Sequence, residues 1–401
     1  MSQDRPLPPG RAAALVVALG VTCALHIGKL PPAVPALQAA LGISLVQAGF
    51  LLSLVQLAGM CLGLFVGLAA DRIGPRRVML AGLLALAIGS LWGGLAGTPT
   101  VLLASRALEG VGFLLAVLPA PALIRRHVEE PRLLARALGW WGAYMPLGTA
   151  LALVLGTPII DHLGWRIVWH GLAGVSVLAM GLLMIAMPAD PPGPAGALRL
   201  WPRLQRTLST PGPWLVATAF LLYSGQWLAV VGFLPTILTQ LGLGAVSVGL
   251  LSALAAAVNM AGNIGAGRWI ARGARPVVVL RTGYLAMAVG ALVAFGLDVP
   301  HGVKYLAVLL FSGVGGLIPG TLFGLAVRLA PGNDTVSTTV GWMQQLSALG
   351  QFTGPPLVAW VATAVGGWQS SWLITGAASL LGLLVAQRIA HQSAAAPHAA
   401  R

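Results

Sequence analysis

Charged side chains are scarce in this chain of 401 residues. Only 8% of the residues are Asp, Glu, Lys or Arg, and only nine are acidic. Hydrophobic residues make up 57% of the chain, and the mean hydropathy is +0.88. A soluble core of this size cannot hide so much apolar surface, so the composition excludes a soluble globular enzyme and indicates that the lipid bilayer is the solvent.

Cysteine is also rare. Cys23 and Cys61 are the only two, and each lies inside a long apolar run. Neither a disulfide framework nor a zinc site has the required spacing or partners. We therefore expect no metal and no cofactor.

The apolar runs are long and do not alternate with polar residues, which predicts helices rather than strands. About 20 apolar residues are needed for one helix to cross a hydrocarbon layer of about 30 Å. The first run contains prolines and lacks a small-residue cleavage site, so we interpret it as a span and not as a signal peptide. The predicted spans are residues 12–38, 46–70, 78–97, 101–124, 137–160, 167–188, 213–240, 246–268, 276–297, 305–329, 336–361 and 371–388.

The basic residues between these spans lie almost entirely on one side of the membrane. With a cytoplasmic N-terminus, only Arg166 and Lys304 fall on the outer side. The positive-inside rule then places both termini in the cytoplasm of a bacterial cell, with the spans in the inner membrane. The net charge of +14 reflects this topology, so we expect membrane lipids and no nucleic acid as partners.

A proline-rich polar stretch divides the chain near its midpoint. It predicts a bundle over residues 1–188, a cytoplasmic linker over 189–212 and a second bundle over 213–401. A shift of about 200 positions reveals an internal repeat, which supports two similar six-helix halves with a pathway between them. The recurring residues are Leu41, Gly42, Val46, Gly49, Leu51 and Leu54, which match Leu241, Gly242, Val246, Gly249, Leu251 and Leu254.

The turn between the second and third spans carries a glycine-and-charge motif. Its residues are Gly67, Asp71, Arg72, Gly74, Arg76 and Arg77. This turn closely resembles the cytoplasmic loop motif of the major facilitator superfamily. The resemblance implies an all-α membrane protein with twelve transmembrane helices in two pseudo-symmetric six-helix bundles, acting as a secondary transporter and not as an enzyme.

Charges at helix ends can hold a cytoplasmic gate in one conformation and release it in another, so we expect the motif to take part in gating. The alternative for Arg76 and Arg77 is that they only follow the positive-inside rule. In the second half, Ala271 stands where the motif has its Asp, so we expect the two gates to differ.

Few ionisable residues lie well inside the predicted spans, where each is a functional hypothesis by default. His26 and Lys29 share one face of the first span, and Arg106 and Glu109 share one face of the fourth. Their predicted depths are similar, so they can lie at one level of one cavity. The excess of positive charge favours a small anion as ligand. The alternatives are a static Arg106–Glu109 pair, a Lys29 that reaches the outer headgroups, and a His26 that only bonds another helix.

The segment from Arg106 to Gly112 resembles the helix 4 motif that the superfamily associates with proton-coupled export. Glu109 stands where Gln is commoner. Burial favours a neutral carboxylic acid, whereas a neighbouring Arg favours the carboxylate, so a conformational change can switch this group. We therefore predict that Glu109 is the proton-coupling residue.

Polar residues in other spans complete the predicted substrate site. The repeat aligns His26 with Gln226. The resemblance implies that the first, fourth, seventh and tenth spans line the cavity. Tyr144, Gln344 and Gln345 are predicted cavity walls, with helix packing or interface anchoring as the alternative for aromatic residues. Within the superfamily, the eleventh predicted span and the cationic first and fourth spans are most similar to the cyanate permease type.

The leading hypothesis is proton-coupled uptake of a small organic or inorganic anion by a monomer that works by alternating access. The alternative is proton-coupled efflux of a drug or hydrophobic metabolite, which the Arg106 motif favours. A membrane-embedded enzyme or receptor would need a catalytic constellation. The sequence shows no nucleophile with a base, no metal-ligand spacing and no phosphate-binding loop.

Overall fold

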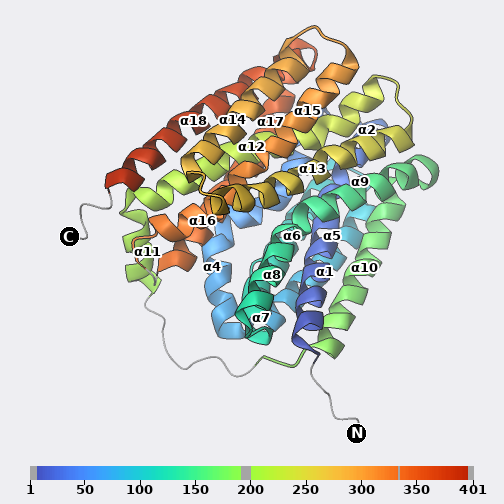
Figure 1. Ribbon diagram of the computed structural model, residues 1–401. Coiled ribbons are helices and arrows are strands. Elements are labelled where there is room, and N and C mark those ends of the chain that lie inside the picture. Colours follow the sequence, from blue (N-terminus) through green and yellow to red (C-terminus); the bar gives the residue numbers. More distant parts are fainter. Residues whose placement is uncertain (1–6, 191–199, 333–334, 396–401) are drawn as a thin grey trace. The chain divides into compact units, whose positions relative to one another are not determined.

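A computed structural model describes residues 7–190, 200–332 and 335–395, and within these ranges the chain forms helices and no strand (Figure 1). The side chains of some residues inside the helices are not described. The helices are α1 (Pro9–Gly28), α2 (Leu30–Leu41), α3 (Leu45–Ser53), α4 (Leu57–Ile73), α5 (Pro75–Gly94), α6 (Pro99–Val117), α7 (Ala120–His127), α8 (Pro131–Gly142), α9 (Tyr144–Leu163), α10 (Trp165–Ala186), α11 (Leu200–Leu208), α12 (Pro211–Gln240), α13 (Ala245–Ala271), α14 (Pro276–Ala291), α15 (His301–Gly315), α16 (Leu317–Leu329), α17 (Val336–Val365) and α18 (Ser371–Ala395). Short 3₁₀ turns at Leu54–Gln56 and Trp368–Ser370 and a π-helical turn at Leu292–Gly296 extend neighbouring helices.

Each predicted span coincides with one of these helices or with two consecutive ones. Among the described residues, 11 helical runs are long and apolar enough to cross a membrane. The predicted span 336–361 is not among the 11, although α17 is a continuous helix of 30 residues. Its Thr, Ser, Gln and Pro residues make it less apolar than the others.

Proline breaks the first span where the site residues lie. Pro31 and Pro32 have no N–H to donate to the carbonyls of Ile27 and Gly28, so α1 ends and α2 begins on either side of Lys29. The broken helix places Lys29 at a bend in the middle of the span.

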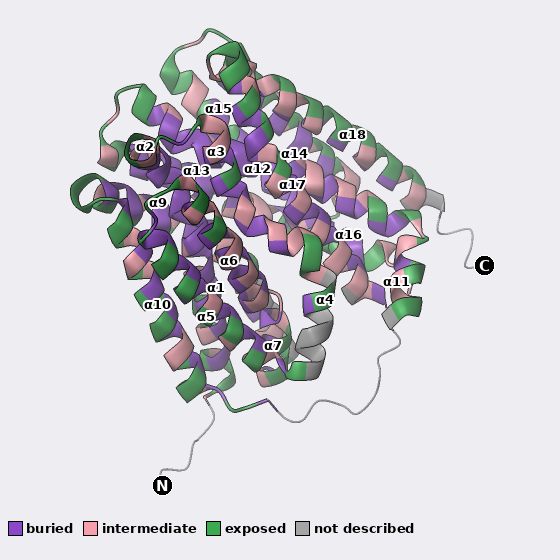
Figure 2. Ribbon diagram, turned by 180° about the vertical axis from the view of Figure 1, so that it is seen from behind, coloured by how far each residue is buried: buried purple, intermediate pink, exposed green. Residues whose placement is uncertain are grey.

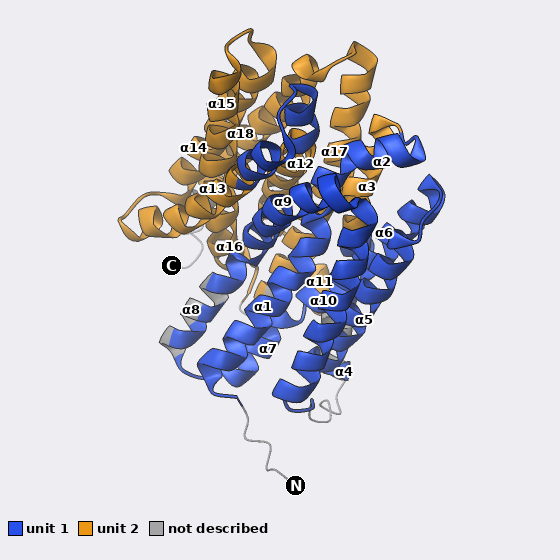
Figure 3. Cartoon of the chain, turned by 90° about the vertical axis from the view of Figure 1, so that its right-hand side faces the viewer, with its two compact units in different colours: residues 1–43, 57–196, 235–253 blue, residues 44–56, 197–234, 254–401 orange. Residues whose placement is uncertain are grey.

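The helices form two compact units, each described here by itself (Figure 3). The first unit holds residues 1–43, 57–196 and 235–253, and the second holds 44–56, 197–234 and 254–401. The predicted linker, 189–212, contains α11, and its residues 191–199 lie outside the described part of the chain. The predicted division into 1–188 and 213–401 therefore stays a prediction about the sequence halves.

Exposed residues, green in Figure 2, include large apolar ones on helices of both units. On α10, Ile185 is 84% exposed and Leu178 is 64% exposed. On α18, Leu384 is 63% exposed. Such surfaces fit contact with lipid tails, because the bilayer replaces water around them.

Glycines bring helix backbones into direct contact inside the first unit. A Cβ atom at Gly82 of α5 would lie 2.4 Å from the backbone nitrogen of Ala116 in α6. A Cβ atom at Gly112 of α6 would lie 2.6 Å from the backbone nitrogen of Leu86 in α5. Both distances are too short for a side chain, so only glycine permits this approach.

The internal repeat reappears as equivalent hydrogen bonds in the two units. In the first unit, His26 Nε2 lies 2.8 Å from Ser176 Oγ, which joins α1 to α10. In the second unit, Ser379 Oγ donates to Gln226 Oε1 at 2.9 Å, which joins α18 to α12. The shift from His26 to Gln226 is 200 positions and that from Ser176 to Ser379 is 203, close to the shift of about 200 positions in the sequence repeat.

Gly148 in the fifth predicted span and Gly350 in the eleventh also make equivalent contacts. A Cβ atom at Gly148 of α9 would lie 2.8 Å from the carbonyl oxygen of Val21 in α1. A Cβ atom at Gly350 of α17 would lie 2.3 Å from the carbonyl oxygen of Leu221 in α12. The two glycines thus allow close backbone contact in both units.

Candidate functional site

The four predicted intramembrane ionisable residues meet in the interior of the first unit. Lys29 lies at the bend between α1 and α2, His26 is in the last turn of α1, and Arg106 and Glu109 are on α6. All four side chains are fully buried. They make a packed group of charges, which we call the charge cluster.

Glu109 is the centre of the charge cluster. Its Oε1 atom accepts a hydrogen bond from Lys29 Nζ, and its Oε2 atom accepts one from Arg106 Nη1. His26 Nδ1 lies 3.5 Å from Oε1. One carboxylate is therefore shared by two cationic side chains, so the predicted Arg106–Glu109 pair is not isolated.

Lys29 points into the unit and does not reach toward the outer headgroups. Its Nζ atom donates to Ser90 Oγ of α5 at 2.8 Å and lies 4.4 Å from the ring centroid of Trp169 on α10. Together with Glu109, these partners equal in number the three N–H donors of the ammonium group. The attraction between a cation and an aromatic ring strengthens when water is absent.

Arg106 also bonds the broken first span. Its Nη1 atom donates to the carbonyl oxygen of His26 at 2.9 Å. That carbonyl lies in the last turn of α1, where helix carbonyls lack intrahelical donors. The charge cluster and the bend of the first span are thus one hydrogen-bonded structure.

In the second unit, the position equivalent to His26 belongs to an uncharged network. Gln226 accepts from Ser379, and its Nε2 atom donates to the carbonyl oxygen of Leu222 at 2.8 Å. Nearby on α12, Tyr223 is bonded to Asn259 of α13, whose amide also donates to the carbonyl oxygen of Ser312 at 2.8 Å. The sequence prediction missed Asn259; a buried amide within a predicted span was the available signal.

The other predicted substrate residues belong to different units. Tyr144 begins α9 in the first unit and stacks on Trp141, with ring centroids 4.4 Å apart. Gln344 is exposed and Gln345 is half-buried, and both are on α17 in the second unit. Their role as cavity walls stays a prediction.

The gating motif is only partly visible. Gly67, Asp71 and Arg72 lie within α4, and their side chains are outside the described residues. Arg76 and Arg77 form the first turn of α5, and Arg76 Nη2 donates to the carbonyl oxygen of Met184 at 2.9 Å. Arg76 therefore contacts α10 in addition to following the positive-inside rule.

The backbone conformation at position 74, directly before α5, requires glycine. Its φ angle is +105°, a conformation that residues with a side chain rarely adopt. A Cβ atom there would also lie 2.3 Å from Cγ of Asp190. The conformation and the close carboxylate both explain why the motif has glycine at this position.

Asp190 is a structural carboxylate that the sequence prediction missed. Its Oδ2 atom accepts from the backbone N–H of Arg77 at 2.8 Å, and its Oδ1 atom accepts from Arg126 Nη1 at 2.7 Å. The carboxylate thus stabilises the positive N-terminal end of α5 and joins it to the end of α7. The available signal was an acidic residue directly after a span, opposite basic residues at helix ends.

Replacement of Asp190 by Asn is expected to destabilise the first unit. The change removes the negative charge next to the α5 N-terminus and weakens the bond to Arg126, at a cost of about 1–3 kcal/mol. Thermal unfolding of the detergent-solubilised protein measures the effect as a lower melting temperature. Asp161→Asn is the matched control, because Asp161 is exposed at the C-terminal end of α9 and its charge is not favourable there. Equal melting temperatures for the two variants would contradict the assignment.

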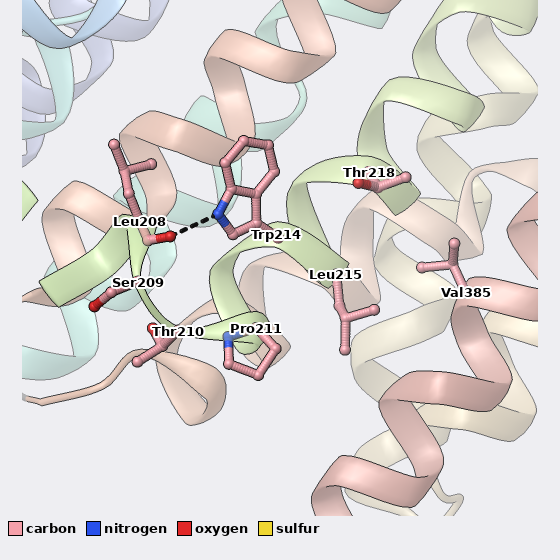
Figure 4. Close-up of a pocket in the computed structure, with 8 residues that line it drawn as sticks. All are labelled: Leu208, Ser209, Thr210, Pro211, Trp214, Leu215, Thr218 and Val385. Carbon is pink, nitrogen blue, oxygen red and sulfur yellow. Dashed lines mark hydrogen bonds between the residues drawn. The ribbon is translucent and has the colours of Figure 1, made fainter. Parts of the chain in front are cut away.

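A surface hollow lies in the second unit, where α11 joins α12 (Figure 4). Its wall combines apolar side chains with the hydroxyls of Ser209, Thr210 and Thr218. Trp214 is part of this wall and donates from Nε1 to the carbonyl oxygen of Leu208 at 2.9 Å. The hollow includes none of the predicted site residues and no charged side chain.

Within the described part of the chain, no group of three His, Cys, Asp or Glu side chains is placed to hold a metal ion. Cys23 and Cys61 are both free thiols.

Comparison with known protein families gives one match over most of the chain. The profile of the Major Facilitator Superfamily matches residues 12–355. Two crystal structures of a bacterial homologue of the human lysosomal transporter Spinster, both described as inward-facing, share the fold. The occupied form has a TM-score of 0.75 at 14% identity and covers 96% of both chains, and the unoccupied form has a TM-score of 0.68 at 16% identity. These matches confirm the predicted all-helical major facilitator fold.

Several curated relatives match shorter parts. The Puromycin resistance protein pur8 of Streptomyces alboniger is 36% identical over 149 residues, which are 37% of this chain and 29% of that protein. The Cephamycin export protein CmcT of Amycolatopsis lactamdurans is 34% identical over 184 residues, which are 44% of this chain and 38% of that protein. The Multidrug resistance protein Stp of Mycobacterium tuberculosis is 34% identical over 101 residues, which are 25% of this chain and 19% of that protein. The chain thus matches less than two-fifths of the length of each relative.

Proposed function

Because the chain belongs to the Major Facilitator Superfamily, whose members are membrane transporters and not enzymes, we propose that it is a proton-coupled exporter of an organic compound. It acts as a monomer in a bacterial inner membrane, with both termini in the cytoplasm, and works by alternating access. The distribution of basic residues along the chain supports this orientation.

The charge cluster carries the proposal of proton coupling. Glu109, Lys29 and Arg106 are fully buried in apolar spans, where each charge is expensive and is usually kept for function. Since the cluster also holds the bend of the first span through Arg106 and the His26 carbonyl, a change in its protonation alters bonds on which the shape of that span depends. Such a link between protonation and helix geometry is what proton-driven transport requires.

The relatives support export as the direction. Puromycin resistance, cephamycin export and multidrug resistance are the names of proteins that match a quarter to almost half of this chain. The segment around Arg106 and Glu109, which resembles the motif associated with proton-coupled export, agrees with them.

Uptake of a small anion together with protons is the second candidate function. It is favoured by the excess of positive charge, since Lys29 and Arg106 share the one carboxylate of Glu109. In this case Lys29, Arg106 and His26 bind the anion by charge-assisted hydrogen bonds. Under either function, Tyr144, Gln226, Gln344 and Gln345 are proposed as walls of the substrate pathway.

We assign the cytoplasmic gate to the loop motif. Asp71 and Arg72 provide the charges on the last turns of α4, which also contains Gly67, and Gly74 provides the tight turn to α5. Arg76 and Arg77 belong to the same device, and the bonds of the Asp190 carboxylate to the backbone N–H groups of both arginines support a fixed geometry there.

Proteoliposomes that enclose a pH-sensitive dye distinguish the two candidate functions by sign. A proton-coupled exporter exchanges protons for substrate, so the addition of puromycin or a cephamycin outside should make the lumen more alkaline at a rate set by the protein. A proton–anion symporter should make the lumen more acidic when cyanate is added. Protein-free liposomes correct for passive movement of weak acids and bases, and Glu109→Gln liposomes should show no coupled signal. Protein-dependent substrate flux that ignores an imposed pH gradient would contradict proton coupling altogether.

A further inference from the structure

We propose that Lys29 is the residue that carries the transported proton, and that Glu109 remains a carboxylate throughout the cycle. This inference rests on the proposed proton coupling and names the atom at which it occurs. It differs from the prediction that Glu109 itself is protonated.

The charge cluster holds more positive than negative charge when its groups are ionised. Lys29 and Arg106 contribute two positive charges, and Glu109 contributes one negative charge. His26 is counted as a neutral imidazole and contributes no charge. Among the described residues, Glu109 is the one carboxylate that Lys29 contacts. With all three groups ionised, the cluster holds one more positive charge than negative charge in a fully buried place. An unbalanced charge is costly where water is absent.

The excess positive charge can be removed by only one change of protonation in the charge cluster. Arg106 keeps its proton, because a guanidinium group is not deprotonated in proteins. A proton added to His26 or to Glu109 makes the cluster more positive, and protonation of Glu109 also removes the negative charge that Lys29 and Arg106 share. Loss of one proton from Lys29 is the one step at these four residues that makes the cluster neutral.

The contacts of Lys29 fit both of its protonation states. As an ammonium group it donates to Glu109 and Ser90 and faces the ring of Trp169. As an amine it keeps two N–H donors for Glu109 and Ser90 and loses its electrostatic attraction to the ring. Neither state leaves a buried polar partner of Lys29 without a bond.

The position of Lys29 connects its charge to the shape of the first span. It is the residue between α1 and α2, where Pro31 and Pro32 have already removed helix hydrogen bonds. A segment with missing backbone bonds bends more easily than an intact helix. Loss of the ammonium charge weakens the contacts that hold this bend against α5, α6 and α10.

Other titratable groups lie on the first span and on the helices packed against it. Elements packed against α1 are α2, α5, α6, α7, α8, α9 and α10. Besides His26, Arg106 and Glu109, the titratable side chains of α1 and of these helices are Arg11, Cys23, Arg76, Arg77, Arg125, Arg126, His127, Arg132, Arg136, Tyr144, Asp161, His162, Arg166 and His170. Among those whose side chains are described, none forms an ion pair with Lys29. His170, next in sequence to Trp169, is the group that needs a control.

Lys29 releases one proton and takes up one proton in each transport cycle. When the site opens to the cytoplasm, the ammonium group of Lys29 transfers one proton to water and becomes an amine. When the site opens to the outside, the amine takes one proton from water there. No other bond is formed or broken, and no further reactant is needed.

Fluorine NMR of protein labelled with 5-fluorotryptophan tests the proposal without a substrate. The Trp169→Phe variant identifies the resonance of Trp169 among those of the 13 tryptophans. In the wild-type protein this resonance should shift with a single one-proton inflection between about pH 5 and about pH 10, the range that covers ordinary His and Lys groups. In Lys29→Met and in Lys29→Arg the inflection should be lost, and in His170→Asn it should remain.

Three results would overturn the assignment. The first is a Trp169 resonance that does not titrate in the wild-type protein. The second is an inflection that survives in Lys29→Met, which would place the proton on Glu109 or His26. The third is an inflection lost in His170→Asn alone. The other tryptophan resonances report whether each variant is folded.

The transport experiment separates this inference from the proposed function. If the liposomes show proton-coupled transport and Trp169 does not report on Lys29, the function stands and another residue carries the proton. If Trp169 reports the titration of Lys29 and transport ignores the pH gradient, proton coupling is wrong although Lys29 titrates.

Discussion

Glu109→Gln should lower the stability of the first unit strongly and abolish coupled transport. The substitution keeps the size of the side chain but leaves Lys29 and Arg106 facing each other without their shared carboxylate. Breaking a buried ion pair by removal of one partner costs about 3–5 kcal/mol. Thermal unfolding in detergent measures the loss, and the liposome assay measures transport.

A second substitution should reverse most of the loss of stability. In the double variant Glu109→Gln with Lys29→Met, Arg106 is the only charged group of the three. The net charge of the charge cluster is then one positive charge, as in the wild-type protein with all three groups ionised. The melting temperature should rise above that of Glu109→Gln alone, whereas transport should remain absent. Glu129→Gln is the control, because Glu129 is exposed at a helix connection. A double variant no more stable than the single variant would show that the cost is not one of charge.

Gly262→Val should disrupt the second unit more than any surface substitution. A Cβ atom at Gly262 of α13 would lie 2.0 Å from the carbonyl oxygen of Gly313 in α15 and 2.9 Å from Cα of Gly316. These neighbours are backbone atoms, which cannot turn aside as a flexible side chain can. Two helices must therefore separate, which costs more than the roughly 1–3 kcal/mol of ordinary overpacking.

Gly267→Val provides a matched control on the same helix. A Cβ atom at Gly267 would meet no atom within 4 Å. The two variants change helix propensity equally, so a difference between their melting temperatures reports the clash alone. We expect Gly262→Val to yield little folded protein and Gly267→Val to behave like the wild-type protein. Similar behaviour of both variants would contradict the close helix contact.

The broken first span shows how much of the fold could be predicted locally. Pro31 and Pro32 act on the carbonyls four residues before them, so the bend at Lys29 follows from the chain itself. The equivalence of Gln226 and His26, which the sequence repeat predicts, agrees with the hydrogen bond that each makes to a serine. Such features depend on short-range sterics or on the equivalence of the two halves.

Asp190 shows why other parts of the site could not be predicted. Its partner Arg126 is 64 positions away, and the backbone N–H of Arg77 is 113 positions away. No local pattern relates these residues, because the contact arises only when α5, α7 and the end of α10 pack together. The direction of the Lys29 side chain could not be predicted either. A flexible side chain at that depth can reach the headgroups or the interior, and its neighbours in the folded protein decide between the two.

The sequence by itself determined that this chain is a helical membrane protein of the major facilitator type, where its spans lie and which few ionisable residues enter them, because transfer of each apolar or charged residue into lipid depends chiefly on that residue. Only the tertiary structure decided that Lys29 and Arg106 share the carboxylate of Glu109 and that Asp190 joins α5 to α7. Those contacts depend on the distances between side chains of different helices, and such distances are set by packing.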